Sequence, residues 1–158
     1  MTATREEIYE ALLAQLRTAG DTFKTYSRRW KSAWDDPAGQ IAATPMLIQW
    51  EQMEQVSWTN RGVGNIMTLS MTLELYAKIP DGMTPGVPTT LQGGSATLNP
   101  LLDAITTALA PDPETGRQSL GDVVTDCRID GTITKVLGDE DPSGLCGALI
   151  PVSILVTT

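Results

Sequence analysis

Histidine is absent from the 158 residues of this sequence, and cysteine occurs only twice. Without histidine, a histidine general base, a Ser-His-Asp triad and a His-ligated metal site are excluded. Cys127 and Cys146 are too few and too far apart for a zinc framework. Both lie in predicted strands, where a buried reduced thiol is more common than a disulfide in a reducing compartment. We therefore expect two reduced, inaccessible thiols, with Cys146 the less protected.

Long apolar runs are also missing. No stretch approaches ~18 uninterrupted apolar residues, so the sequence predicts no membrane-spanning helix. Charged side chains interrupt the first ten residues, which argues against a signal peptide, so we expect the protein to stay in the compartment where it is made. The 41% hydrophobic and 19% charged content is ordinary for a globular protein. A chain of this length most simply forms one domain, residues 1–158.

Positive charge is scarce in the second half. Residues 1–79 carry 8 Lys/Arg against 9 Asp/Glu, whereas residues 80–158 carry 3 against 10. All eight aromatic residues precede residue 80. Nucleic-acid binding normally needs a basic patch, so the acidic half is not expected to attract nucleic acid.

Two helices carry clear end signals. Thr4-x-x-Glu7 is a capping-box pattern, and the apolar residues that follow it at helical spacing predict a helix over about 5–18. The second helix is expected to have Asn99 as its N-cap and Pro100 as its first residue. Its apolar face comprises Leu98, Leu101, Leu102, Ile105 and Leu109, and Pro111 and Pro113 end it.

Five segments read as strands: about 23–30, 46–56, 67–79, 123–133 and 146–156. Strict alternation over 67–79 predicts one face on a core and the other toward water or a partner, in an antiparallel sheet. Gly131 suggests a bulge, and Pro151 predicts that the last strand lies at an edge or is bulged. Residues 80–96 form a long Gly/Pro-rich loop. The resulting fold class is α+β: a single antiparallel or mixed sheet of about five strands with two helices on one face, in the order α-β-β-β-α-β-β.

Candidate chemistry in the sequence is sparse. The carboxylate pairs Asp35/Asp36 and Asp126/Asp130 and the cluster Asp139, Glu140 and Asp141 are capable of acid/base work or cation binding, but solvated surface acids are the simpler interpretation. The glycine pairs lack the pattern of a phosphate loop. We expect no catalytic residue, no cofactor and no metal.

A second candidate is basic and aromatic. Arg28, Arg29 and Lys31 alternate with Tyr26, Trp30 and Trp34. A nucleic-acid patch and a half-buried strand edge with solvated arginines are both compatible with this pattern. We favour a third interpretation, in which these residues complement an acidic neighbouring subunit.

The sequence resembles the tail terminator (tail completion) proteins of long-tailed bacteriophages over most of its length. The resemblance depends on the order of several short segments, not on a catalytic signature. They are residues 5–12 (REEIYEAL), 25–30 (TYSRRW), 34–36 (WDD), 98–105 (LNPLLDAI), 108–113 (ALAPDP) and 150–154 (IPVSI).

The resemblance implies a small α+β subunit that forms a ring, usually six-fold, on the tail tube. Such a ring stops tube polymerisation and presents the surface that joins the head. Its partners would be further copies of itself, the tail tube protein and a head–tail connector protein, with DNA passing through unbound. The protein would be made in the bacterial cytoplasm and reside in the virion, at the head-proximal end of the tail.

Two sets of residues follow as site candidates within that role. Subunit contacts are expected from Arg28, Arg29 and Trp30, and from Met83, Pro85 and Val87 in the long loop. An acidic lining of the DNA passage is expected from Asp126, Asp130, Asp139, Glu140 and Asp141, because acids repel phosphates; solvated acids that aid solubility are the alternative.

Three other functions remain open on the sequence. A different head–tail connector or a tube-like subunit would also assemble into a ring. A soluble enzyme using Asp126 or Asp130 is less favoured, because no nucleophile or cofactor loop is recognisable. An adaptor that adds a peptide strand to an exposed sheet edge is the third.

Overall fold

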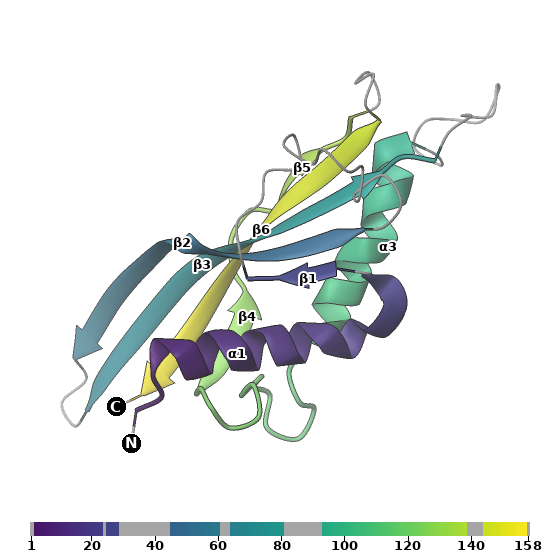
Figure 1. Cartoon of the computed structure of the whole chain (residues 1–158). Coiled ribbons are helices and arrows are strands. Elements are labelled where there is room, and N and C mark those ends of the chain that lie inside the picture. The colour runs from purple at the N-terminus through teal and green to yellow at the C-terminus, as the bar shows by residue number, and fades with distance from the viewer. Residues whose placement is uncertain are drawn as a thin grey trace.

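The computed structural model describes residues 2–23, 25–28, 45–60, 64–80, 93–138 and 144–157. Two α-helices, a 3-10 helix and six strands lie in these ranges (Figure 1). In chain order they are α1 (Arg5–Leu16), the 3-10 helix η1 (Arg17–Thr22), β1 (Thr25–Ser27), β2 (Met46–Asn60), β3 (Asn65–Lys78), α3 (Gly93–Ala108), β4 (Asp126–Ile129), β5 (Thr134–Val136) and β6 (Leu145–Thr157). The predicted α+β class is confirmed, with six strands in place of about five.

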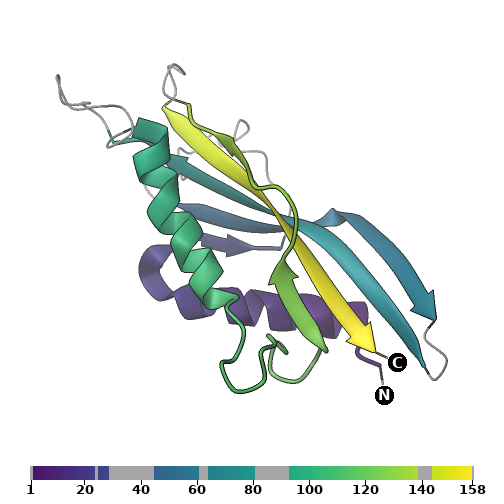
Figure 2. The same cartoon turned by 180° about the vertical axis from the view of Figure 1, so that it is seen from behind.

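All six strands belong to one mixed sheet. Its order is β1-β2-β3-β6-β4, and β5 also pairs with β6. Only the short β1–β2 pair is parallel; the other pairs are antiparallel. The sheet is long and strongly twisted, and both α-helices pack on the same face of it (Figures 1 and 2). None of the described helices lies on the opposite face, called the outer face below.

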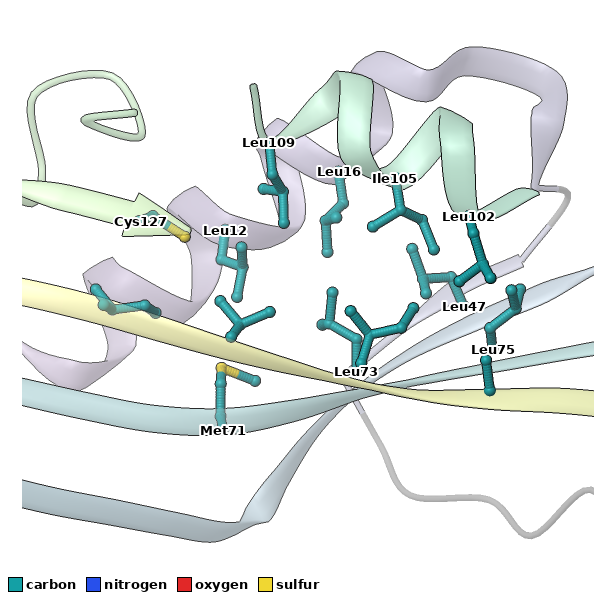
Figure 3. Close-up of a cluster of buried hydrophobic side chains, with 14 of the residues drawn as sticks. Leu12, Leu16, Leu47, Met71, Leu73, Leu75, Leu102, Ile105, Leu109 and Cys127 are labelled. Atoms are coloured by element: carbon teal, nitrogen blue, oxygen red, sulfur yellow. The ribbon is translucent and has the colours of Figure 1, made fainter. Parts of the chain in front are cut away.

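The core lies between that single layer of helices and the sheet (Figure 3). Alternate residues of β3 from Met67 to Ala77 point into it and are buried, as the sequence alternation predicts. Leu12 and Leu16 of α1 and Leu102 and Ile105 of α3 pack against them. Burial of these side chains provides most of the drive to fold, since each contributes roughly 1.5–3 kcal/mol relative to an exposed position.

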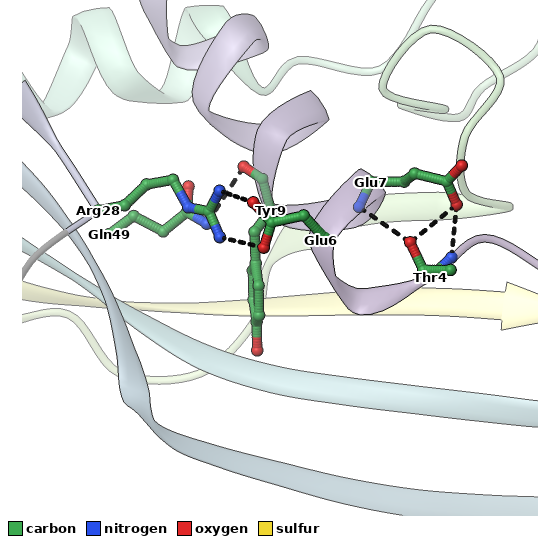
Figure 4. Close-up of polar contacts among 6 residues, drawn as sticks. All are labelled: Thr4, Glu6, Glu7, Tyr9, Arg28 and Gln49. Atoms are coloured by element: carbon green, nitrogen blue, oxygen red, sulfur yellow. Dashed lines mark hydrogen bonds and ion pairs between the residues drawn. The ribbon is translucent and has the colours of Figure 1, made fainter.

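The start of α1 matches its prediction. The Thr4 hydroxyl accepts a hydrogen bond from the Glu7 N–H at 3.3 Å, and the Glu7 carboxylate accepts one from the Thr4 N–H at 2.7 Å (Figure 4). These reciprocal bonds form the capping box that the sequence indicates. The helix ends at Leu16, and η1 continues it to Thr22 with a kink at Gly20.

The start of α3 was predicted wrongly. The helix begins at Gly93, so Pro100 lies inside it and Asn99 is not its N-cap. Residues 93–96, expected to belong to the loop, are helical. Close packing favours the earlier start, because Gly94 lies so near β5 that a Cβ there would come within 1.7 Å of the Leu137 carbonyl oxygen. Pro100 is exposed, so the carbonyl that loses its helical donor does not face the core.

The segment predicted as a fourth strand is two strands. β4 pairs Ile129 with Val152, and β5 pairs Thr134 with Leu149, so the edge gains two residues between them relative to β6. Gly131, with φ of 120°, lies in this extra segment, which confirms the predicted irregularity there. Pro151 lies opposite it. The prediction that β6 lies at an edge is wrong, because β6 pairs with β3 on one side and with β4 and β5 on the other.

Candidate subunit interface

Arg28 is the one predicted contact residue of the first strand that the structure describes. Its guanidinium bonds the Glu6 carboxylate at 2.6 and 3.0 Å and lies 5.7 Å from the centre of the Tyr9 ring (Figure 4). Glu6 has a lowered pKa, chiefly because of the Arg28 hydrogen bond. The structure thus places Arg28 in a contact between the end of β1 and α1, within the same chain. The other strand and loop candidates, Arg29, Trp30, Met83, Pro85 and Val87, lie outside the described residues.

Asp126 does not fit its expected role of facing DNA. It lies on the outer face of β4, as the alternation predicts, but its side chain is buried. The carboxylate accepts a hydrogen bond from the Gln118 N–H at 3.1 Å and pairs with Arg128. Burial alone would raise the pKa of Asp126, but these partners lower it below its usual value. The turn-rich segment before β4 includes Gln118. Its hydrogen bond to Asp126 therefore holds that segment against the sheet.

The remaining acidic candidates divide into two groups. Asp130 is exposed just beyond β4, and its N–H donates to the Pro151 carbonyl at 3.1 Å. Asp139, Glu140 and Asp141 lie outside the described residues.

The outer face of the sheet carries the least expected feature. Glu74 lies on this face of β3 and is buried, and the Tyr76 hydroxyl donates to its carboxylate at 2.7 Å. Met46 and Ile48, opposite these two residues on β2, are also buried there. Burial, followed by the bond to Glu74, raises the pKa of Tyr76 well above its usual range. Sequence alternation missed this apolar region, because a glutamate in an alternating strand reads as a solvated residue.

A cavity of about 160 Å³ opens beside this cluster on the outer face. Tyr76, Val136, Leu145, Gly147 and Leu149 line it, and they come from β3, β5 and β6. Leu149 is 41% exposed and Val136 55% exposed, although both are apolar. A cavity lined by apolar side chains on a protein surface suits an apolar side chain of a partner better than a polar substrate.

The helix-covered face contains a separate polar network at the other end of the sheet. Glu54, in the irregular part of β2, accepts hydrogen bonds from the Tyr9 hydroxyl and, at 2.7 Å, from Arg5. These bonds, that of Tyr9 foremost, lower the pKa of Glu54. Gln49 is fully buried nearby and donates to the Tyr9 carbonyl at 3.3 Å, while its own Oε1 has no partner. The network links α1 to β2, so its role is structural.

Both cysteines are free and buried, as predicted. Cys146 is no less protected than Cys127, because both thiols lie on the core side of their strands. Burial, with the nearby Asp126 charge, raises the pKa of Cys127 to about 12. Neither thiol is therefore suited to nucleophilic chemistry at neutral pH.

Within the described ranges, no group of three or more His, Cys, Asp or Glu side chains is arranged to hold a metal ion. None of the helices described there has the length and apolar content needed to cross a bilayer. No protein-family model matches the sequence, and no curated protein sequence matches it.

Proposed function

We propose that this protein is a structural subunit of a long-tailed bacteriophage, one that forms a ring on the head-proximal end of the tail tube. In this role the ring ends tube polymerisation and provides the surface to which the filled head joins. The tail tube protein and a head–tail connector protein are its partners, and DNA passes through the ring without specific binding. The ordered resemblance to tail terminator proteins motivates the proposal; it covers residues 5–12, 25–30, 34–36, 98–105, 108–113 and 150–154.

The observation that carries the proposal is the one-sided sheet. Both α-helices cover one face, and the outer face presents an apolar cavity edged by exposed Val136 and Leu149. Exposed apolar surface of this kind is typical of protein–protein contact sites. A ring subunit needs two dissimilar contact surfaces, and the uneven charge of the two sequence halves supplies a further difference between them.

Deletion of the gene in the phage is the direct test. We expect heads and tails that remain unjoined, with tails of irregular or excessive length, as seen by electron microscopy. Supplying the wild-type protein in trans should restore joined tails of uniform length. Joined tails of normal length in the deletion phage would refute the proposal. Uniform tails that fail only in joining would instead identify a head–tail connector, the neighbouring role in the particle.

A further inference from the structure

Four large apolar side chains of the described residues are exposed, and they lie in two separate places. Trp58, near the end of β2, is 60% exposed. Val136, Leu137 and Leu149 are the other three, and they lie around β5 and the first half of β6. These two places are at opposite ends of the sheet (Figures 1 and 2).

Trp58 is exposed although it lies on the core-facing side of β2. It pairs with Met67 of β3, so it lies on the face that the helices cover elsewhere. The paired ends of β2 and β3 extend past the first turn of α1 (Figure 1). Trp58 is exposed, although its partner Met67 is buried. An indole is the largest apolar side chain and buries ~150–250 Å² when it is enclosed. Leaving it in water is unfavourable unless a partner covers it.

A close approach of the backbone to β3 requires glycine in the wall of the cavity at the other end. Gly147 lies in its wall, and a Cβ at this position would come within 2.8 Å of the Leu75 carbonyl oxygen and 3.3 Å of the Tyr76 ring. The remaining lining is mainly apolar or aromatic, with Tyr76 on one side and Leu149 on the other. This opening has the chemistry to receive one bulky apolar side chain.

We propose that Trp58 of one subunit inserts into the cavity beside Tyr76 and Leu149 of a second subunit. The contact is head-to-tail, because the inserted group and the cavity belong to different ends of the chain, and head-to-tail contacts build rings when the rotation closes. The inference rests on the proposed function in so far as the copies form the ring on the tail.

The distribution of charge is compatible with a second copy as the occupant. Lys78 lies on the outer face opposite Leu145, which lines the cavity, while the first turn of α1 carries Glu6 and Glu7 against Arg5, with Glu6 paired to Arg28. The remaining difference in net charge between the two surfaces favours this orientation over its reverse. A stable interface buries ~800 Å² per partner, so Trp58 supplies an anchor and the flanking strand ends supply the rest.

Light scattering on the purified full-length protein is the first measurement. We compare wild type, Trp58→Ala and, as matched control, Ser57→Ala, which alters the exposed neighbour on the other face of β2. Loss of an interface anchor costs ~2 kcal/mol or more, so Trp58→Ala should need at least tenfold more protein to assemble. Circular dichroism should show all three equally folded, because Trp58 is exposed within the single chain. Assembly of Trp58→Ala at the wild-type concentration would overturn the proposal.

Disulfide cross-linking identifies the two surfaces and keeps Trp58 and Leu149 in place. Asn60→Cys, near Trp58, and Val136→Cys, at the cavity edge, are purified separately and then oxidised alone or mixed. Only the mixture should yield a cross-linked dimer, and adding Trp58→Ala to the Asn60→Cys protein should abolish it. Cross-linking of Asn60→Cys with itself would indicate a symmetric contact and overturn the proposal, as would no cross-link in the mixture. Because only purified protein is used, either result leaves the deletion phenotype as an independent test of the function.

Discussion

β3 and β6 pair without interruption from Ile66–Thr157 to Lys78–Leu145, whereas the strands on either side of them are both irregular. On one side, β2 gains three residues relative to β3 between Trp50 and Gln55. On the other side, two extra residues separate β4 from β5. The centre keeps its register even through Pro151, which has no N–H to donate.

The difference assigns separate tasks to the two regions. In the centre, an unbroken register keeps every second side chain of β3 and β6 in the core, since a slip of one residue would turn them all to the outer face. In the flanks, the extra residues carry some of the polar contacts. Glu54 reaches α1 from the irregular part of β2, and Asp130 bonds the Pro151 carbonyl from the gap between β4 and β5. Regular pairing of β3 and β6 therefore stabilises the core, and the interruptions determine the shape of the sheet edges.

A cavity in the centre should have the largest effect. Leu73 is fully buried in β3, so Leu73→Ala should lower the free energy of unfolding by about 2–5 kcal/mol. Val136→Ala in the flanking strand β5 removes an exposed side chain and should change it by less than about 0.5 kcal/mol. Urea denaturation measures the free energy of unfolding of both variants, which should show the same dependence on urea concentration. Similar losses in the two variants would remove the distinction between centre and flank.

Overpacking at the flank should have the next largest effect. Gly94→Ala places a methyl group 1.7 Å from the Leu137 carbonyl oxygen, so α3 and the end of the β5 segment must move apart. We expect a loss of about 1–3 kcal/mol, measured by thermal denaturation. Ser95→Ala in the same helical turn is the control and should stay close to wild type. Unchanged stability of Gly94→Ala would show that α3 and the end of the β5 segment can move apart without a loss of free energy.

Removing the first helix cap should have a smaller effect. Thr4→Ala deletes the hydroxyl that accepts from the Glu7 N–H and should cost about 0.5–2 kcal/mol. Thr2→Ala, exposed and outside the capping box, is the control. Chemical denaturation compares the two. Equal stability of the two variants would mean that other contacts hold the start of α1.

The smallest effect concerns pH. The pKa of Asp126 is lowered in the folded state, so its contribution to stability is present above its unfolded pKa of about 3.9 and is lost as pH falls through the folded pKa. Asp126→Asn should therefore flatten the dependence of unfolding free energy on pH below about 4. Denaturation at several acidic pH values tests this, with exposed Asp130→Asn as control. An unchanged slope in Asp126→Asn would mean that the Gln118 and Arg128 contacts add nothing beyond the cost of burial.

The sequence predicted correctly those elements that depend on residues close together in the chain. The capping box at Thr4 and the alternation of β3 depend on residues close in sequence, and both appear as expected. Asn99-Pro100 misled because it has the chemistry of a helix start, while the actual start depends on packing of Gly94 against a residue more than forty positions away.

The candidate site was less predictable for the same reason. Pro151 predicted an edge or bulged strand, yet β6 is internal and the irregularity lies in the neighbouring edge opposite the proline. Asp126 and Glu74 alternate as surface residues do, and only the folded chain reveals that Gln118 and Tyr76 bond them in buried positions. The apolar cavity joins residues of three strands, so no single stretch of sequence announces it.

The gap between β4 and β5 also has a consequence for aggregation of the chain. A strand as long as β6, with one side open, would offer a continuous row of backbone groups on which strands of other chains can add without limit, as in amyloid. Instead, two short strands of four and three residues cover that side, and the turn at Gly131 separates them. These short, separated strands make the addition of further strands at this edge difficult. Side chains at the edge can still contact a limited number of partners.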